Sequence, residues 1–341
     1  MARDNAQRKH RVSMLDIATA AHVSPSTASR ALNGHPKVSD EARKAVLDAA
    51  EKLGYVRNLG AASLASSQSN TIGLLIRDVG NQFYGGLASH VQAETDRYGF
   101  DLLLATGGDS VESQMRAVRN LLGHGVGGII IASGRVAAQV ADYAAKFVPT
   151  VVLASGLELP SLNSVRIDPQ MEAKLAHIVV DHGHRNIAVT ASSDSLASAL
   201  HARIANFLTE LIVAGAETTI ISLANDDTDI DKKIDEVLDS GATAIMAGND
   251  SIALSVLEYL DSAGIACPGE VSVTGFDGIG PYRSSLFGLT TVEQPIDKLA
   301  HEAVKLMSRH LHDESPHTSQ VLVRGRFIEG RTLGSVRGSA N

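Results

Sequence analysis

The chain has 341 residues, of which 44% are hydrophobic and 20% are charged, and it contains no Trp. This length allows two or three domains with a sizeable core, and the composition is that of an ordinary globular protein. A single cysteine, Cys267, excludes a disulfide framework within the chain and fits a reducing compartment. No apolar run approaches the roughly 20 residues of a membrane span, and no apolar segment follows the charged N-terminus. We therefore expect a cytoplasmic protein without a signal peptide and without a membrane partner.

The net charge of −8 is unevenly distributed along the chain. Residues 1–70 carry ten Lys or Arg and six Asp or Glu, a balance of +4, whereas the remainder carries 20 and 32, a balance of −12. A small basic segment before a larger acidic one favours a head that alone contacts a polyanion.

Residues 12–57 predict three short helices. The first is expected over 14–21, with Leu15, Ile17 and Ala18 on its apolar face. The second is expected over 24–33, with a serine at its N-cap and a proline at its first helical position. The third is expected over 39–53 and ends at a glycine. Because a tight turn separates the first two, the segment predicts a helix-turn-helix.

Residues 58–70 are small, polar and nearly uncharged, which is typical of a linker, and Leu59 and Leu64 are its large apolar residues. From residue 71 the pattern alternates strand, loop and helix. Buried strands are expected over 71–76, 101–106, 127–133, 150–155, 186–192, 219–224, 244–249 and 271–276, because their apolar runs are continuous rather than alternating. Helices are expected between them, the first three over about 83–98, 112–123 and 136–145.

Two consecutive βαβ series predict an α/β core made of two doubly wound lobes with parallel sheets. Ligands of such sheets bind at the carboxyl ends of the strands. Polar residues gather at these ends, which favours a small, hydroxyl-rich ligand between the lobes; they are Arg77, Asp78, Ser192, Ser193, Asn249, Asp250 and Asp277.

The segment VSMLDIATAAHVSPSTASRALNGHPKVSDEARKAVLDAAEKLGY resembles the DNA-binding head of the LacI/GalR family of bacterial transcription regulators. Farther along, NTIGLLI, GHRNIAV, GND and VSVTGFD followed by LTTVEQP are similar to landmarks of the same family, in the same order. The resemblance covers nearly the whole chain. It implies an all-α helix-turn-helix head over 1–57, a hinge helix over 58–70, and a core over 71–341 like type I periplasmic binding proteins. The implied N-lobe covers about 71–166 and 296–323, and the implied C-lobe covers about 167–295 and 324–341.

The resemblance also implies roles in DNA binding, since the family's second helix enters the major groove. By matching position, Pro25, Ser26 and Arg30 would face bases, while backbone phosphates would be held by Ser24, Thr27, Ser29 and Asn33. Leu64 keeps the position of a leucine that wedges into the minor groove. Two alternatives stay open: the hydroxyls cap the helix and face water, and Leu64 packs on the core. His22 replaces a glycine of the turn, which predicts mild backbone strain.

For the effector site, the matching positions supply donors and acceptors for hydroxyl groups, with one aromatic ring to pack against a ligand face. They are Asp78, Asn81, Phe83, Arg203, Asn249, Asp277 and Gln294. Arg203 is the strongest of these candidates, and its alternative role is a surface ion pair. The implied effector is a sugar, a polyol or a nucleoside-like molecule.

The chain contains no nucleophile elbow, Walker sequence or paired cysteine, so we expect no catalytic residue, no cofactor and no metal. His182 and His184 have a spacing that could hold a metal, but a loop histidine that holds backbone is the preferred interpretation. The resemblance implies a repressor that acts as a homodimer on near-palindromic, double-stranded operator DNA. The alternatives are a regulator without an effector, a solute-binding protein, and an enzyme on a doubly wound core.

Overall fold

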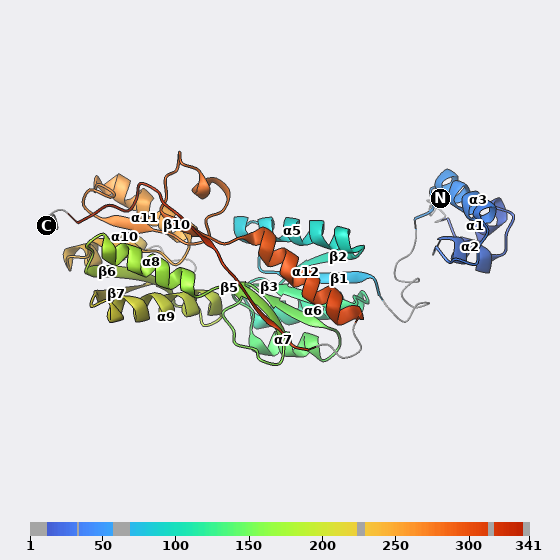
Figure 1. Ribbon diagram of the computed structural model, residues 1–341, viewed down its shortest axis with the longest axis horizontal. Helices are drawn as coiled ribbons and strands as arrows, with labels where there is room; N and C mark the ends of the chain where they lie inside the picture. The colour runs from blue at the N-terminus through green and yellow to red at the C-terminus, as the bar shows by residue number, and fades with distance from the viewer. Residues whose placement is uncertain (1–11, 33, 57–68, 224–228, 313–316, 337–341) are drawn as a thin grey trace, which may run out of the picture. The chain divides into compact units, whose positions relative to one another are not determined.

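The computed structural model describes residues 12–32, 34–56, 69–223, 229–312 and 317–336 (Figure 1). The chain divides into two compact units, Met1–Ser67 and Gln68–Asn341, which are called the head and the core below. Asn33 and Leu64, both expected to contact DNA, lie outside the described residues. Within these ranges no helix is both long enough and apolar enough to cross a membrane.

The head consists of three helices, α1 (Met14–Ala20), α2 (Pro25–Leu32) and α3 (Asp40–Leu53). They enclose a small core in which Ile17, Ala28 and Val46 are fully buried. The expectation that Leu15 belongs to this apolar face is wrong, because Leu15 is 63% exposed. Ile17 and Ala18, the other two residues expected on this face, are buried, and Leu15 lies roughly 200° around the helix from Ile17.

The turn between α1 and α2 is tight and strained. The N–H of Val23 donates to the Ala18 carbonyl at 2.9 Å, which closes the turn. His22 has a φ of 54°, which confirms the strain predicted at this position. The Ser24 hydroxyl then accepts from the N–H of Thr27 at 3.1 Å and caps α2, as a serine at this position is expected to do.

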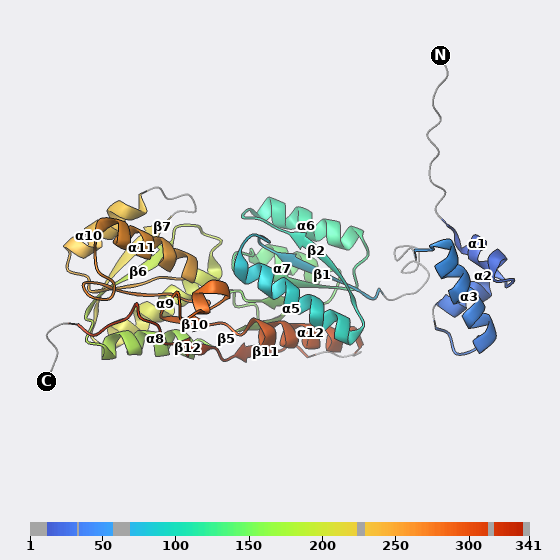
Figure 2. The same ribbon diagram turned by 90° about the horizontal axis from the view of Figure 1, so that it is seen from above.

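The first lobe of the core, the N-lobe, is built on a parallel sheet with the strand order β11-β5-β4-β3-β1-β2. Its strands are β1 (Thr71–Ile76), β2 (Asp101–Thr106), β3 (Gly128–Ala132), β4 (Thr150–Leu153), β5 (Asn163–Ile167) and β11 (Gln320–Val323). One face is covered by α5 (Gln82–Tyr98) and α12 (Ile296–His312), which lie together in Figures 1 and 2. The other face is covered by α6 (Val111–Gly123) and α7 (Ala138–Ala145).

Residues of β1 alternate between these two layers. Ile72, Leu74 and Ile76 pack against α5 and α12, whereas Leu75 packs against α6 and α7. Because both faces are covered, the strand is apolar throughout, as predicted. The same expectation is wrong for β2, where Leu104 is 43% exposed. The cause is its position, since β2 is an edge strand with a neighbour on one side only.

The second lobe, the C-lobe, has a parallel sheet with the strand order β7-β6-β8-β9. Its strands are β6 (Asn186–Ser192), β7 (Glu217–Leu223), β8 (Ala244–Met246) and β9 (Ser272–Thr274). One face packs against α8 (Gln170–Asp181) and α9 (Ser198–Val213), and the other against α10 (Ile230–Asp239) and α11 (Asp250–Ala263). The 3₁₀ helix η1 (Gly280–Arg283) precedes an antiparallel pair of β10 (Thr291–Glu293) and β12 (Arg326–Ile328). The prediction of two doubly wound lobes is confirmed.

Within the described residues, the chain passes between the two lobes in three short segments, 167–170, 293–296 and 323–326 (Figure 1). Two of them are joined directly, because the N–H of Asp168 donates to the Val323 carbonyl at 2.9 Å. The remaining segment is tied to the C-lobe by the N–H of Gln294, which donates to the Asp277 carbonyl at 2.9 Å. The lobes are therefore joined by three chain segments that backbone hydrogen bonds hold in place.

Candidate functional site

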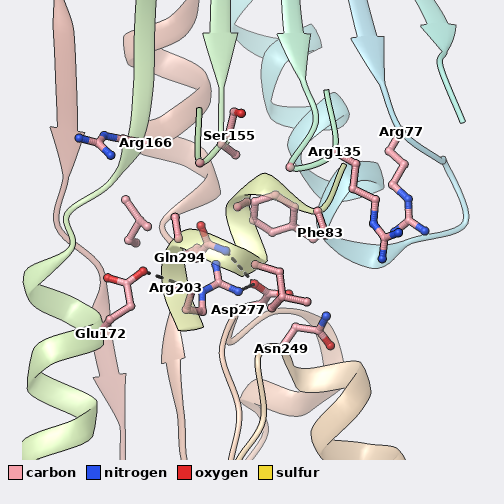
Figure 3. A pocket seen from close by; sticks show the side chains of 18 of the residues that line it. Arg77, Phe83, Arg135, Ser155, Arg166, Glu172, Arg203, Asn249, Asp277 and Gln294 are labelled. Atoms are coloured by element: carbon pink, nitrogen blue, oxygen red, sulfur yellow. Dashed lines mark hydrogen bonds and ion pairs between the residues drawn. The ribbon is translucent and has the colours of Figure 1, made fainter. Parts of the chain in front are cut away.

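A cavity of about 130 Å³ lies between the two lobes of the core, where the strands of both sheets end. Six of the seven residues expected to bind an effector line it (Figure 3); they are Asn81, Phe83, Arg203, Asn249, Asp277 and Gln294. Asp78 does not line the cavity. Its carboxylate is exposed and accepts from the N–H of Gly80 at 2.9 Å, so it closes the turn after β1 instead.

Arg203 occupies the middle of this site and reaches it from α9. Its guanidinium lies 3.8 Å from the centroid of the Phe276 ring, and Nη1 donates to the Gly248 carbonyl at 2.6 Å. Nη1 also lies 3.9 Å from Asp277 Oδ1. Arg203 is only 8% exposed, which excludes the alternative of a surface ion pair.

Glu172, in the first turn of α8, is the residue that sequence reasoning missed. Its Oε1 lies 3.9 Å from Arg203 Nε, and the residue is 4% exposed. Burial raises the pKa of Glu172 to about 7, although the charge of Arg203 lowers it. Among the described residues neither Glu172 Oε2 nor Arg203 Nε has a hydrogen-bond partner. An unmade hydrogen bond of a buried group costs about 1–3 kcal/mol, so both atoms favour a bound polar partner.

Asp277 follows β9 and is held in a constrained loop. Its φ is 131°, and its Oδ1 accepts from Gln294 Nε2 at 2.7 Å. Burial raises the pKa of Asp277 to about 7; Arg203 lowers it and the nearby charge of Asp250 raises it further. Asp250 supports this loop, because its Oδ2 accepts from the N–H of Gly278 at 2.7 Å and its Oδ1 accepts from Thr291 Oγ1 at 2.6 Å.

The two asparagines of the site cap helices whose N-termini face the cavity. Asn81 Oδ1 accepts from the N–H of Phe83 at 3.0 Å at the start of α5. Asn249 Oδ1 accepts from the N–H of Ile252 at 2.8 Å at the start of α11. Because each side-chain oxygen is used by the cap, the amide NH₂ groups are the groups left to donate to a ligand.

At one edge of the cavity the two lobes touch directly. The Gly134 carbonyl, after β3, accepts from the N–H of Ala199 at 3.0 Å and from Ser198 Oγ at 3.2 Å. Gly156, after β4, lies so close that a Cβ there would come within 2.1 Å of the Ser198 carbonyl oxygen. The contact therefore requires a glycine at position 156.

In the head, α2 has one apolar and one polar side. Ala28 and Ala31 are buried, while Ser24, Pro25, Ser26 and Arg30 are exposed and Thr27 and Ser29 are partly so. Arg30 Nε donates to the Ser26 carbonyl at 3.1 Å, which holds the guanidinium along the helix. The helix thus presents hydroxyls and one guanidinium together on its exposed side.

The two histidines of the DHGHRNI segment hold protein groups. His184 Nδ1 lies 2.9 Å from Thr243 Oγ1, and its Nε2 lies 2.9 Å from the Gly334 carbonyl. His182 Nδ1 lies 2.8 Å from the Ile178 carbonyl. In the described part of the chain, no group of three or more His, Cys, Asp or Glu is placed to hold a metal ion.

A helix-turn-helix head and a two-lobed core with a polar cavity, in one chain, are the parts expected of a DNA-binding protein that also has a ligand-binding domain. The model of the "Bacterial regulatory proteins, lacI family" matches residues 13–58, and that of the "Periplasmic binding protein-like domain" matches residues 176–333.

Similar proteins agree with this assignment over most of the chain. Catabolite control protein A of Priestia megaterium is 30% identical over 325 residues, which cover 93% of this chain and 97% of that protein. The HTH-type transcriptional regulator GalR of Escherichia coli (strain K12) is 29% identical over 93% of this chain and 96% of its own. A solved structure of the lac repressor dimer, bound to operator and the anti-inducer ONPF, has a TM-score of 0.82 at 24% identity and covers 95% of this chain and 99% of its own.

The chain therefore belongs to the LacI/GalR family of transcription regulators, which confirms the resemblance found in the sequence. It is a regulator with a DNA-binding domain and a ligand-binding domain, and its relatives are regulators of transcription rather than enzymes.

Proposed function

We propose that this regulator is a repressor that binds a near-palindromic operator as a homodimer, under the control of a small polar ligand in the cavity. The ligand is a sugar, a polyol or a nucleoside-like molecule. The observation that carries the proposal is a pair of residues that line the cavity, Glu172 and Arg203, whose buried atoms Oε2 and Nε have no hydrogen-bond partner among the described residues. The functional divisions we infer are a DNA-binding domain over 1–57, a hinge over 58–70 and an effector-binding and dimerisation domain over 71–341.

The exposed side of α2 supports binding to DNA. A guanidinium such as that of Arg30 can donate two hydrogen bonds to a guanine, which contributes roughly 1–3 kcal/mol of discrimination. The serine and threonine hydroxyls nearby suit phosphate oxygens, which fix the register of the helix on the duplex. The lac repressor structure is that of a dimer on its operator. A two-fold dimer of this chain would require two half-sites related by the same symmetry.

The lobe contacts support control by a ligand. Because the lobes touch at Gly134 and Ser198 and share three backbone crossings, a ligand between them changes their relative position by favouring one arrangement. Linkage requires that operator DNA change the affinity for the ligand by the same factor as the ligand changes the affinity for DNA, typically 1–3 kcal/mol.

The DNA part is tested by selecting operators from random duplexes with the full chain and then measuring affinity for the selected site. Arg30→Gln should weaken specific binding by about 1–3 kcal/mol and relax the preference at one base pair. Lys44→Gln removes the same charge from an exposed position of α3 and is the matched control. An equal loss in both variants, with unchanged base preference, would refute base recognition by Arg30.

The effector part is tested by a thermal-shift screen of sugars, polyols and nucleosides. A ligand at 100 times its dissociation constant stabilises the core by roughly 2.7 kcal/mol. Arg203→Met should abolish the shift, while Arg116→Met, at an exposed position of α6, should preserve it. A ligand whose affinity is the same with and without operator DNA would contradict allosteric control.

A further inference from the structure

Two arginines of the cavity have no part in the contacts described so far. Arg77 follows β1 and Arg135 follows β3, and both line the cavity from the N-lobe. Their side chains are 23% and 14% exposed. Arg77 Nε pairs with Asp109 Oδ1 at 2.5 Å, and Arg135 Nη1 pairs with Asp194 Oδ2. Neither carboxylate lines the cavity; Asp109 is 49% exposed, and Asp194 binds Arg135 from the C-lobe.

The two guanidinium groups converge on the same end of the cavity. Figure 3 shows both pointing from the strand ends of the N-lobe toward the C-lobe. The Tyr84 hydroxyl also lines this end of the cavity and accepts from the N–H of Gly134, the residue before Arg135, at 2.9 Å. A guanidinium has five N–H donors, and each of these arginines uses one in its ion pair with an acid. Most of their donors are therefore available to a ligand.

The charge of the cavity also favours an anion. Its lining contains more arginines than acids. The arginines are Arg77, Arg135, Arg166 and Arg203, and the acids are Glu172 and Asp277. Burial raises the pKa of both acids to about 7, which reduces the negative charge they carry at neutral pH. The partner of Arg77, Asp109, is 49% exposed, and water screens its charge. Arg135 keeps its partner Asp194, which is 16% exposed, so the charge left for a ligand to neutralise at this edge is mainly that of Arg77.

We propose that the effector is a polyhydroxyl compound that carries an oxyanion, a phosphate or a carboxylate, bound by Arg77 and Arg135. Its hydroxyl groups contact Arg203 in the middle of the cavity and Glu172 beyond it. The planar fork of a guanidinium matches both kinds of oxyanion, because two parallel N–H groups meet two oxygens. This inference rests on the proposed role of the cavity as an effector site.

The same geometry gives the anion a mechanical consequence. Arg135 belongs to the N-lobe and Asp194, which follows β6, belongs to the C-lobe. An oxyanion at Arg135 competes with Asp194 for the same guanidinium. Binding of the anion therefore weakens one direct link between the lobes at the edge of the cavity.

The test is isothermal titration calorimetry of the full chain with matched compounds. One set is glucose, glucose 6-phosphate and glucuronate; a second is ribose and ribose 5-phosphate; inorganic phosphate is measured alone. At least one anionic member should bind about tenfold or more tightly than its neutral counterpart. A preference for glucose 6-phosphate identifies a phosphate, and a preference for glucuronate identifies a carboxylate.

Three variants, each checked for folding by circular dichroism, sharpen the test. Arg77→Gln should lower the affinity for the anionic compound by about 10- to 100-fold, as expected for a lost charge-assisted hydrogen bond. Asp109→Asn removes the carboxylate that competes for Arg77, so it should raise the affinity for the anionic compound a few-fold. Arg116→Gln removes a charge from an exposed position of α6 and should change nothing.

Two outcomes would overturn the inference, and they differ in what else they refute. If neutral sugars bind as tightly as their anionic counterparts, or if Arg77→Gln weakens both equally, the oxyanion is refuted while the effector site stands. If no compound binds while the chain still binds its selected operator, both the oxyanion and the proposed effector control are refuted.

Discussion

Replacing Glu172 by Gln tests whether the buried carboxylate beside Arg203 stabilises the core or opposes its folding. Glutamine keeps the shape of the side chain and resembles the protonated carboxyl group. The Glu172 side chain is 5% exposed, and the 3.9 Å between its Oε1 and Arg203 Nε is longer than a hydrogen bond. Burial raises the pKa of Glu172 from 4.5 to about 7, so the cost of desolvation exceeds the attraction of Arg203.

The sign of the effect follows from the direction of this shift. Because the pKa is higher in the folded than in the unfolded state, ionisation of Glu172 opposes folding, and stability is lost as the pH rises from about 4.5 through 7. The difference between 4.5 and about 7 corresponds to about 3 kcal/mol. Glu172→Gln should therefore be more stable than the parent by about 1 kcal/mol at pH 5 and about 3 kcal/mol at pH 8. Asp277 is present in both proteins, so its own titration largely cancels.

The measurement is urea unfolding of the core, followed by circular dichroism in steps from pH 5 to pH 8 without ligand. Glu112→Gln is the control, since Glu112 is 89% exposed on α6 and its replacement should give no pH-dependent difference. A Glu172→Gln variant that is less stable than the parent, by a margin that grows with pH, would show that the ion pair with Arg203 is net stabilising and would refute the reasoning.

Three further predictions concern the lobe contact and the head. Gly156→Val places a side chain where a Cβ alone would come within 2.1 Å of the Ser198 carbonyl oxygen, so it should force the lobes apart. The affinity for the ligand, measured by calorimetry, should fall about tenfold or more. An unchanged affinity would show that the contact is dispensable. Ser24→Ala removes the cap of α2 and should lower the stability of the head by about 1 kcal/mol, measured by hydrogen exchange at α2 amides. His22→Gly relieves a positive φ and should raise the midpoint of thermal unfolding of the head, with a gain of about 0.5–1 kcal/mol; a lower midpoint would mean that the His22 side chain contributes more than the strain costs.

The parts of the fold that could be predicted from the sequence are those in which burial dictates local composition. The strands β1 and β6 have the bounds expected from their continuous apolar runs, because strands of a covered parallel sheet need no polar alternation. The bounds of β2 were also expected, although this edge strand is not buried. The strands β5 and β11 were not predicted. They are short and carry polar residues, and β11 joins the sheet only after α12 returns the chain to the N-lobe, which no local pattern records.

The candidate site shows the same limit at the level of single residues. Asp78 and Asp277 both follow a strand, and the sequence treats them alike. Only the fold shows that the Asp78 carboxylate turns back to Gly80 while Asp277 faces the cavity. Glu172 lies in an amphipathic helix in which nothing sets it apart. It reaches Arg203 because α8 packs beside α9, and this packing of helices is a property of the tertiary structure.

The contact between the lobes and the cavity depend on the same helix. Near its start, α9 contacts the N-lobe, since Ser198 Oγ and the N–H of Ala199 donate to the Gly134 carbonyl. Farther along, α9 carries Arg203, whose guanidinium faces Glu172 and Asp277. A helix held by continuous backbone hydrogen bonds moves as one body. A ligand that displaced Arg203 would therefore also displace the residues of α9 that contact the N-lobe, so its affinity would depend on the arrangement of the lobes.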